Sequence, residues 1–285
     1  MISYLLYKIA KFLAIILPRK IGYILASFIA KSRFYLSKED REAVLYNIRR
    51  VMSQASDKEI RRVSKKVFEN FGKYLVDFLR FSKINEDFIN RYVKIENIDF
   101  LKEALHKFKG VIALTAHLGN WELGGAIVAK LGYPLYAVAL THNYPKVNDF
   151  FNKQRALCGV RVIPVGLALK KCFKLLKRKN IVALLGDRDF RGSGLTLDFC
   201  GRKANIPRGT AIFSLRTGAP IVPAFLIRKP QDKFSLIFEK PIYPFDEGTR
   251  FKKEEDLIGE YLRVFEKYVK RYPSQWYMFQ PFFKE

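Results

Sequence analysis

The spacing of hydrophobic residues divides the chain into two parts that meet near residue 92. Before that point, the apolar residues of the segment 60–78 recur every three or four positions, which predicts one amphipathic helix. Ser56 and Glu59 stand just before it as an S-x-x-E capping box, so the helix is expected to begin there. After residue 92, short apolar runs alternate with amphipathic stretches, a pattern typical of α/β proteins.

Six apolar runs in the second part predict buried strands, at residues 93–95, 111–115, 135–140, 161–164, 181–185 and 221–227. Helical patterns fill the intervals, at residues 98–108, 120–131, 145–158, 166–178 and 208–217. The other patterns predict a hairpin on this layer, an antiparallel edge strand and a closing helix, at residues 195–199 with 203–206, 234–238 and 253–271. We therefore expect one α/β domain with a mostly parallel central sheet flanked by helices.

The first 33 residues carry six basic side chains and no acidic one. Their apolar stretches, residues 12–17 and 21–30, are each far shorter than the roughly 20 residues needed to span a bilayer. Pro18 lies between them and breaks a helix. This pattern favours two helices in a membrane interface, with apolar side chains in the lipid and basic ones toward anionic headgroups. A single long span and an ordinary buried helical hairpin are the alternatives.

The overall charge narrows the class of partner. The chain has 285 residues, of which 49% are hydrophobic, and a formal net charge of +25. It can therefore bury a core, and its partner should be anionic: nucleic acid, anionic lipid or an acidic carrier protein. The sequence has no RNP motif, zinc finger or helix-turn-helix signature. Together with the apolar, basic start, this favours a membrane over nucleic acid.

The cysteines and histidines exclude two further classes of site. The three cysteines are odd in number and far apart, which argues against a disulfide framework or a zinc ribbon. We expect them to be small buried hydrophobic residues in a reducing compartment. With only three histidines in the chain, a His-rich metal site is excluded, and no metal is expected.

The most informative segment runs from Gly110 to Glu122, where an apolar strand ends in a loop that carries His117. Open α/β sheets bind their ligands at this end of their strands. Asn120 is placed to cap the following helix, and Glu122 in its first turn is expected to fold back toward the imidazole. Gly119 permits a tight turn, so that N–H groups at the helix start face a developing oxyanion.

No other nucleophile competes with this histidine. The sequence lacks the G-x-S-x-G, Walker A, G-x-G-x-x-G, H-E-x-x-H and C-x-x-C motifs. In an enzyme, His117 would then activate a hydroxyl group that the substrate brings. The alternative is a structural histidine satisfied by Glu122.

The segment Thr115-Ala-His-Leu-Gly-Asn-Trp-Glu122 resembles the H-x4-(D/E) signature of the lysophospholipid acyltransferase superfamily. Its H-x-G-N-W-E form is similar to that of bacterial lipid A late (lauroyl/myristoyl) acyltransferases and of the phosphatidylinositol mannoside acyltransferases. Other segments resemble the family in the family's order, at Asn47, Arg155, Gly186-Asp-Arg-Asp189, Phe199-Cys-Gly201, Ile206-Pro-Arg-Gly209, Arg216-Thr-Gly-Ala-Pro-Ile-Val-Pro223 and Pro273-Ser-Gln-Trp276.

The resemblance implies transfer of a fatty acyl group from a thioester to a lipid hydroxyl, on a glycerolipid acyltransferase-like fold. His117 would be the general base, and Glu122 would orient and charge it. The positions implied to bind substrate are Gly119, Asn120, Arg155, Asp187, Arg188 and Arg208. Among these, Arg155 would contact a phosphate or an oxyanion and Asp187 would position groups in the pocket.

The resemblance also implies partners and a location. The donor would be acyl carrier protein or acyl-CoA, with no cofactor beyond this thioester, and the acceptor a lipid A precursor or another anionic membrane lipid. Residues 1–33 would associate with the membrane and residues 34–285 would form the acyltransferase domain, at the cytoplasmic face of a bacterial inner membrane. Nucleic acid is not an expected partner.

Two features depart from the family pattern. The family's last motif often contains a histidine and an arginine that are missing from the end of this chain, so the resemblance does not imply an acceptor contact there. Glu247-Gly-Thr-Arg250 spells a block of glycerolipid acyltransferases but comes too late in the chain, and we interpret it as a coincidental loop. The alternatives are a phosphatidylinositol mannoside or lysophospholipid acyltransferase, and a catalytically silent lipid-binding protein.

Overall fold

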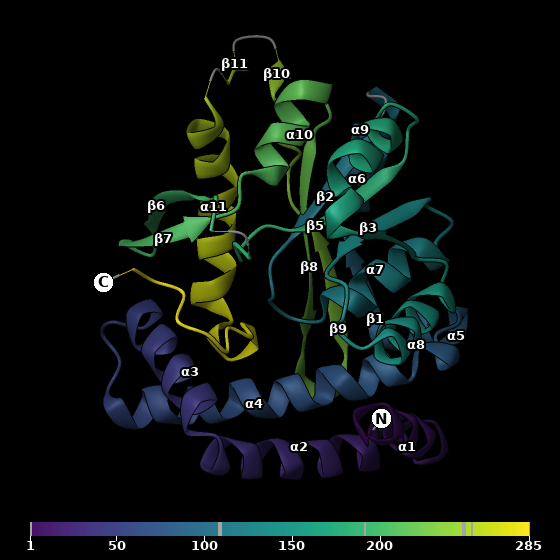
Figure 1. The fold of residues 1–285 in the computed structure, drawn as a ribbon, viewed down its shortest axis with the longest axis vertical. Helices are drawn as coiled ribbons and strands as arrows, with labels where there is room; N and C mark the ends of the chain where they lie inside the picture. Colours follow the sequence, from purple (N-terminus) through teal and green to yellow (C-terminus); the bar gives the residue numbers. More distant parts are fainter. Residues whose placement is uncertain (1, 108–109, 191, 247–248, 252, 285) are drawn as a thin grey trace.

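The protein is an α/β domain built on one central sheet, seen in a computed structural model that describes residues 2–107, 110–190, 192–246, 249–251 and 253–284 (Figure 1). Over these residues the sheet has seven strands in the order β1-β9-β8-β2-β5-β3-β4. The strands are β1 (Val93–Glu96), β2 (Val111–Thr115), β3 (Leu135–Ala139), β4 (Arg161–Pro164), β5 (Ile181–Leu185), β8 (Ile221–Arg228) and β9 (Phe234–Phe238). The α/β class and the mostly parallel sheet are confirmed.

One prediction about the strands is corrected and another is confirmed. The segment 234–238 is antiparallel to β8 as expected, but it is not an edge strand, because β1 pairs with its other side in parallel. The hairpin of β6 (Leu195–Phe199) and β7 (Arg202–Ile206) forms a two-stranded sheet of its own. It packs against a helix and, through Phe199, Ala204 and Ile206, in the same core cluster as Ile112 and Leu114 of β2, so the predicted hairpin on this layer is confirmed.

Helices cover both faces of the sheet, close to the predicted ranges. They are α5 (Glu86–Tyr92), α6 (Ile98–Lys107), α7 (Trp121–Lys130), α8 (Pro145–Ala156), α9 (Ala168–Leu176), α10 (Gly209–Thr217) and α11 (Glu254–Arg271). Successive residues of β2 point to opposite cores: Ile112 packs in the cluster with α9, α10 and α11, and Val111 in the cluster with α6 and α7. A strand that is buried on both faces has apolar residues at every position. For this reason its sequence does not alternate between apolar and polar residues.

The N-terminal third adds α1 (Ile2–Ile16), α2 (Arg19–Leu36), α3 (Lys38–Val51) and α4 (Asp57–Leu79). The break between α1 and α2 at Pro18 confirms the prediction of two helices. Ser56 accepts the N–H of Glu59, so the predicted cap of α4 is also confirmed. Figure 1 shows α4 crossing below the sheet, with α1 and α2 beyond it. Within the described residues, neither these helices nor any other is long and apolar enough to cross a bilayer.

The block at 247–250 lies partly outside the described residues, which omit 247 and 248. Its last two residues form the short strand β11 (Thr249–Arg250), which pairs with β10 (Phe245–Asp246).

Candidate active site

His117 and Asp187 meet at the carboxyl edge of the sheet because the strands before them are neighbours. β2 and β5 pair in parallel, with Thr115 opposite Leu185 at their ends. Parallel strands present their carboxyl ends at one edge, so the two loops that follow lie side by side. As a result, Nδ1 of His117 lies 2.7 Å from Oδ1 of Asp187.

The Asp187 carboxylate is buried and accepts further hydrogen bonds. Its Oδ2 accepts the backbone N–H of His117 at 2.9 Å and the indole N–H of Trp276 at 3.3 Å. Burial alone would raise the pKa of Asp187, but the charge of His117 and these hydrogen bonds lower that pKa below its ordinary value. The carboxylate therefore stays ionised and holds the proton of His117 on Nδ1, which leaves Nε2 as the basic nitrogen. Nε2 makes no hydrogen bond with any of the described residues.

The loop between β2 and α7 is clamped by its backbone. The N–H of Gly119 donates to the Gln275 carbonyl and the N–H of Asn120 to the Leu226 carbonyl, each at 2.8 Å. Gly119 has a φ of +68°, and a Cβ there would stand 2.1 Å from the Leu226 oxygen, so only glycine fits. These two N–H groups are therefore engaged, and an oxyanion would have to use the next N–H groups of α7.

Glu122 pairs with Arg155 on α8. The guanidinium donates from Nε at 3.1 and 3.0 Å to the two carboxylate oxygens, and from Nη2 at 2.6 Å. Burial opposes the charge on Arg155, but Glu122 outweighs it and raises the pKa of Arg155. We expected Glu122 to reach His117, but no such contact occurs among the described residues. The Glu122 carboxylate instead binds the guanidinium of Arg155, and the carboxylate beside the imidazole is that of Asp187.

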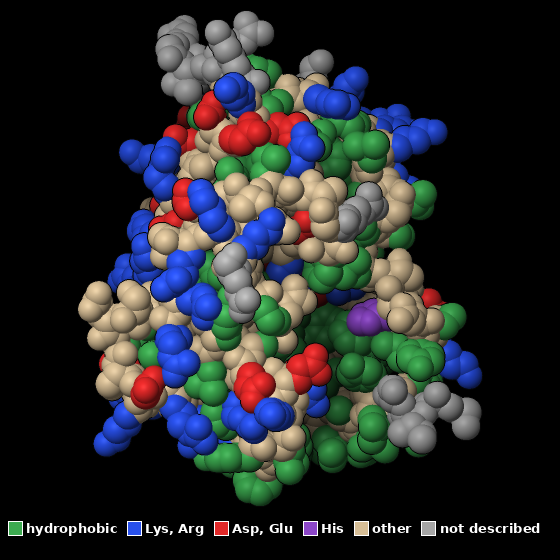
Figure 2. All heavy atoms as spheres, turned by 60° about the vertical axis from the view of Figure 1, so that its left-hand side comes forward, with side chains coloured by type: hydrophobic (Ala, Val, Ile, Leu, Met, Phe, Trp, Pro, Cys, Tyr) green, Lys and Arg blue, Asp and Glu red, His purple; other side chains and the backbone are tan. Residues whose placement is uncertain are grey.

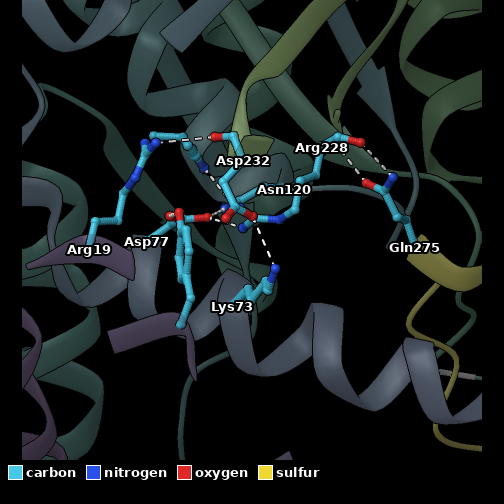
Figure 3. A network of polar contacts seen from close by, with 9 residues as sticks. Arg19, Lys73, Asp77, Asn120, Arg228, Asp232 and Gln275 are labelled. Atoms are coloured by element: carbon cyan, nitrogen blue, oxygen red, sulfur yellow. Dashed lines mark hydrogen bonds and ion pairs between the residues drawn. The ribbon is translucent and has the colours of Figure 1, made fainter. Parts of the chain in front are cut away.

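A buried cluster around Asp77 of α4 supports the same loop (Figure 3). Oδ2 of Asp77 accepts the Asn120 side-chain amide at 2.8 Å and Nη2 of Arg228 at 2.5 Å, and Oδ1 accepts the hydroxyl of Tyr23. The Asn120 amide oxygen in turn accepts the N–H of Leu123 and caps α7. Both polar atoms of the Asn120 side chain are thereby used within the protein.

Sequence reasoning missed Asp77 and Arg228. The one signal for Asp77 was its place in the helix, since an acid three residues after Tyr74 falls on the apolar face of α4. Arg228 ends an apolar strand, where a surface residue is the ordinary expectation. Its side chain is instead only 7% exposed, and the pKa of Arg228 is raised because Asp77 outweighs the cost of burial.

Two predicted residues remain, Arg188 and Arg208. Arg188 lies beside the His117–Asp187 pair and Arg208 does not. Arg188 follows Asp187 and donates to the Gln280 side chain at 2.6 Å, while its Nε is buried with no hydrogen-bond partner among the described residues. Arg208 forms a bidentate pair with Glu254 at 2.6 and 3.1 Å. Arg208 is the N-cap residue of α10, and Glu254 lies in the first turn of α11.

The sequence profile of bacterial lipid A biosynthesis acyltransferases matches residues 1–285. The chain belongs to this family. The phosphatidylinositol mannoside acyltransferase of Mycolicibacterium smegmatis is 23% identical over 216 residues, which are 74% of this chain and 69% of the relative. The lipid A biosynthesis palmitoleoyltransferase of Escherichia coli is 24% identical over 233 residues, 81% of this chain and 74% of the relative.

In this acyltransferase, the motif residue Asn47 serves the C-terminal segment. Its amide donates to the carbonyls of Met278 and Gln280 at 3.0 and 2.8 Å, and its oxygen accepts the N–H of Phe282. This segment brings Trp276 to Asp187, so Asn47 supports the site from a distance.

The Glu122–Arg155 pair should couple strongly in folding. Glu122→Gln leaves a largely buried guanidinium without its anion, which should cost about 1–3 kcal/mol of unfolding free energy. Adding Arg155→Met should recover part of the loss, with a coupling of about 0.5–3 kcal/mol in a double-mutant cycle from urea titrations. The exposed Glu59–Arg62 pair is the control and should couple by less than about 1 kcal/mol. Equal coupling in the two pairs would contradict this prediction.

Asp187 should make the free energy of unfolding depend on pH in the acid range. Its pKa is lowered in the folded protein, so its contribution is complete above the ordinary value of 3.8 and is lost as the pH falls below it. The stability difference between wild type and Asp187→Asn should therefore be largest at neutral pH and shrink toward about pH 3. Urea midpoints at the two pH values measure it. The exposed Asp99→Asn should show almost no such change, and a wild-type advantage that grows with acid would refute the assignment.

Proposed function

We propose that this acyltransferase moves a fatty acyl group from the thioester of acyl carrier protein or coenzyme A to a hydroxyl of a lipid A precursor or related glycolipid. The observation that carries the proposal is the 2.7 Å contact between His117 and Asp187 at the carboxyl edge of the sheet. A histidine held by a buried carboxylate through Nδ1 has the arrangement of a general base.

The chemistry follows from that geometry. Nε2 of His117 takes the proton of the acceptor hydroxyl while the hydroxyl oxygen attacks the thioester carbonyl carbon. Asp187 stabilises the imidazolium, and the first N–H groups of α7 stabilise the oxyanion, aided by the helix dipole. The tetrahedral intermediate then expels the thiolate, which takes the proton from Nε2. The products are an ester and a free thiol.

Two arginines have separate roles in the proposal. Arg155 holds Glu122 and so fixes the first turn of α7, where the oxyanion would form. Arg188, beside Asp187, has a buried Nε with no hydrogen-bond partner among the described residues, and it binds a phosphate of the donor or acceptor. Arg208 has no part in this site.

We also propose that α1 and α2 seat the enzyme on the cytoplasmic face of the membrane. Large apolar side chains are exposed along both helices, among them Phe12, Ile24 and Phe28. Hydrophobic side chains gather at the lower end of the molecule in Figure 2, and Lys and Arg lie beside and above them. An apolar face bordered by basic residues fits a bilayer with anionic headgroups.

The acceptor is tested by a product assay. Membranes with wild type or His117→Ala receive labelled acyl-carrier-protein and acyl-CoA donors, over lipid A precursors, phosphatidylinositol mannosides and lysophospholipids. We expect a new acylated glycolipid from wild type only. Acylation restricted to the mannosides would favour the branch of the mycobacterial relatives. No product from any pair, with lipid bound equally by both proteins, would replace the proposal with a silent lipid-binding protein.

A further inference from the structure

An apolar groove of about 740 Å³ runs between α1, α2 and α4. This volume lies in the range of roughly 300–1,000 Å³ that is usual for ligand pockets. Phe71 and Leu75 of α4 line it on one side, and Leu13 of α1 and Leu25 of α2 on the other. Almost every side chain that lines it is apolar, so it suits a hydrocarbon chain better than a polar ligand.

A chain of aromatic contacts joins this groove to the active site. Phe71 lines the groove and stacks on Tyr74 at 5.4 Å between ring centres. Tyr74 lies 4.5 Å from Trp121, and Trp121 lies 5.1 Å from the imidazole of His117. Phe279, from the C-terminal segment, lines the groove as well and contacts Phe71 at 5.0 Å. Three ring-to-ring contacts therefore connect the lining of the groove to the imidazole of the proposed base.

The groove also continues into the exposed apolar face of the N-terminal helices. Leu13, Leu25 and Ile29 line it, and they are 46%, 46% and 68% exposed. α2 separates most of α4 from that face, and the two helices are close at Gly72, where a Cβ would stand 2.8 Å from the carbonyl oxygen of Ala26. The apolar lining thus extends from the exposed face of the N-terminal helices to α4.

We propose that this groove binds one acyl chain of a membrane lipid, which enters from the bilayer and places the lipid's polar part near His117. The inference rests on the proposed function and describes its acceptor more closely, as a lipid that already carries a long acyl chain. The groove opens on the face that we assign to the bilayer. A donor thioester on a water-soluble carrier would instead arrive from the aqueous side.

Photolabelling tests the groove without acyl transfer. The full-length His117→Ala protein is bound to phosphatidylcholine–phosphatidylglycerol vesicles that contain a phospholipid with a diazirine in the middle of one acyl chain. After irradiation, mass spectrometry locates the label. We expect it on residues 71–79 of α4 and on Phe279. Label confined to outward residues such as Phe12, Ile24 and Phe28, or no label at all, would overturn the inference.

Two matched variants and a second probe sharpen the result. Leu75→Trp fills the groove and should reduce the label on Phe71 and Phe279 severalfold. Ile24→Trp adds the same side chain to α2 at a position that is 68% exposed and does not line the groove, and it should leave that label unchanged. Stronger labelling of the same residues by an acyl-CoA with the same diazirine chain would assign the groove to the donor and overturn the inference.

The two proposals fail separately in these experiments. Groove labelling in a protein whose wild type transfers no acyl group would remove the proposed function and keep the lipid site. Acyl transfer by wild type, with no label in the groove, would keep the function and remove the lipid site.

Discussion

The His117→Ala enzyme should transfer acyl groups roughly 10²–10⁴-fold more slowly than wild type, because the acceptor hydroxyl loses its general base. Both the ring and the backbone N–H of His117 bond to Asp187, and in the proposed mechanism the ring has no contact with the bound acceptor other than proton transfer. The loss should therefore appear in kcat, with little change in the KM for the acceptor. Asp187→Asn keeps the shape of the partner but removes the charge that stabilises the imidazolium, and it should also lower kcat. Initial rates with a saturating donor measure both effects.

A second histidine provides the control. His106 lies in the last turn of α6, is exposed, and should be replaceable by alanine with no loss of rate. Wild-type activity in His117→Ala would reject the proposed base, whatever the acceptor. A large loss in His106→Ala would mean that the assay reports stability and not the chemical step.

Asp77→Ala should lower the free energy of unfolding by about 3–5 kcal/mol, the usual cost of leaving a buried charge without its partner. Asp77 is the common acceptor of Arg228, Asn120 and Tyr23, and Arg228 keeps its charge after the substitution (Figure 3). The cap of α7 should loosen as well, because the Asn120 side chain loses its hydrogen bond to Asp77 and keeps only the one from the N–H of Leu123. Urea titrations followed by tryptophan fluorescence measure the change.

The outer part of the same network separates this effect from ordinary ion pairing. Asp232 also accepts from Arg228, at 3.3 Å, but it is partly exposed, and Asp232→Ala should cost less than about 1 kcal/mol. Arg228→Met added to Asp77→Ala should recover part of the loss, since it removes the stranded cation. Equal costs for the two aspartates, or no recovery in the double variant, would disprove the buried-charge account.

Local patterns predicted most of the fold for a definite reason. A capping box, a periodic apolar face and a strand buried on both sides are each encoded within a few neighbouring residues, so Ser56, the helix after it and the run 111–115 were found correctly. The position of residues 234–238 was not, because the pairing of β1 with β9 joins segments far apart in the chain. The apolar run at 234–238 has the same appearance in an edge strand and in an inner one.

The candidate site divides in the same way. The sequence by itself predicted that His117 stands at the end of a buried strand, that a capped helix follows, and that residues 1–33 favour two helices broken at Pro18. Only the tertiary structure decided which carboxylate serves the imidazole. Glu122 is near His117 in sequence, yet Asp187 reaches it because parallel pairing of β2 and β5 brings two distant loops to one edge. Strand order depends on the packing of the whole sheet, and five residues of spacing do not contain that information.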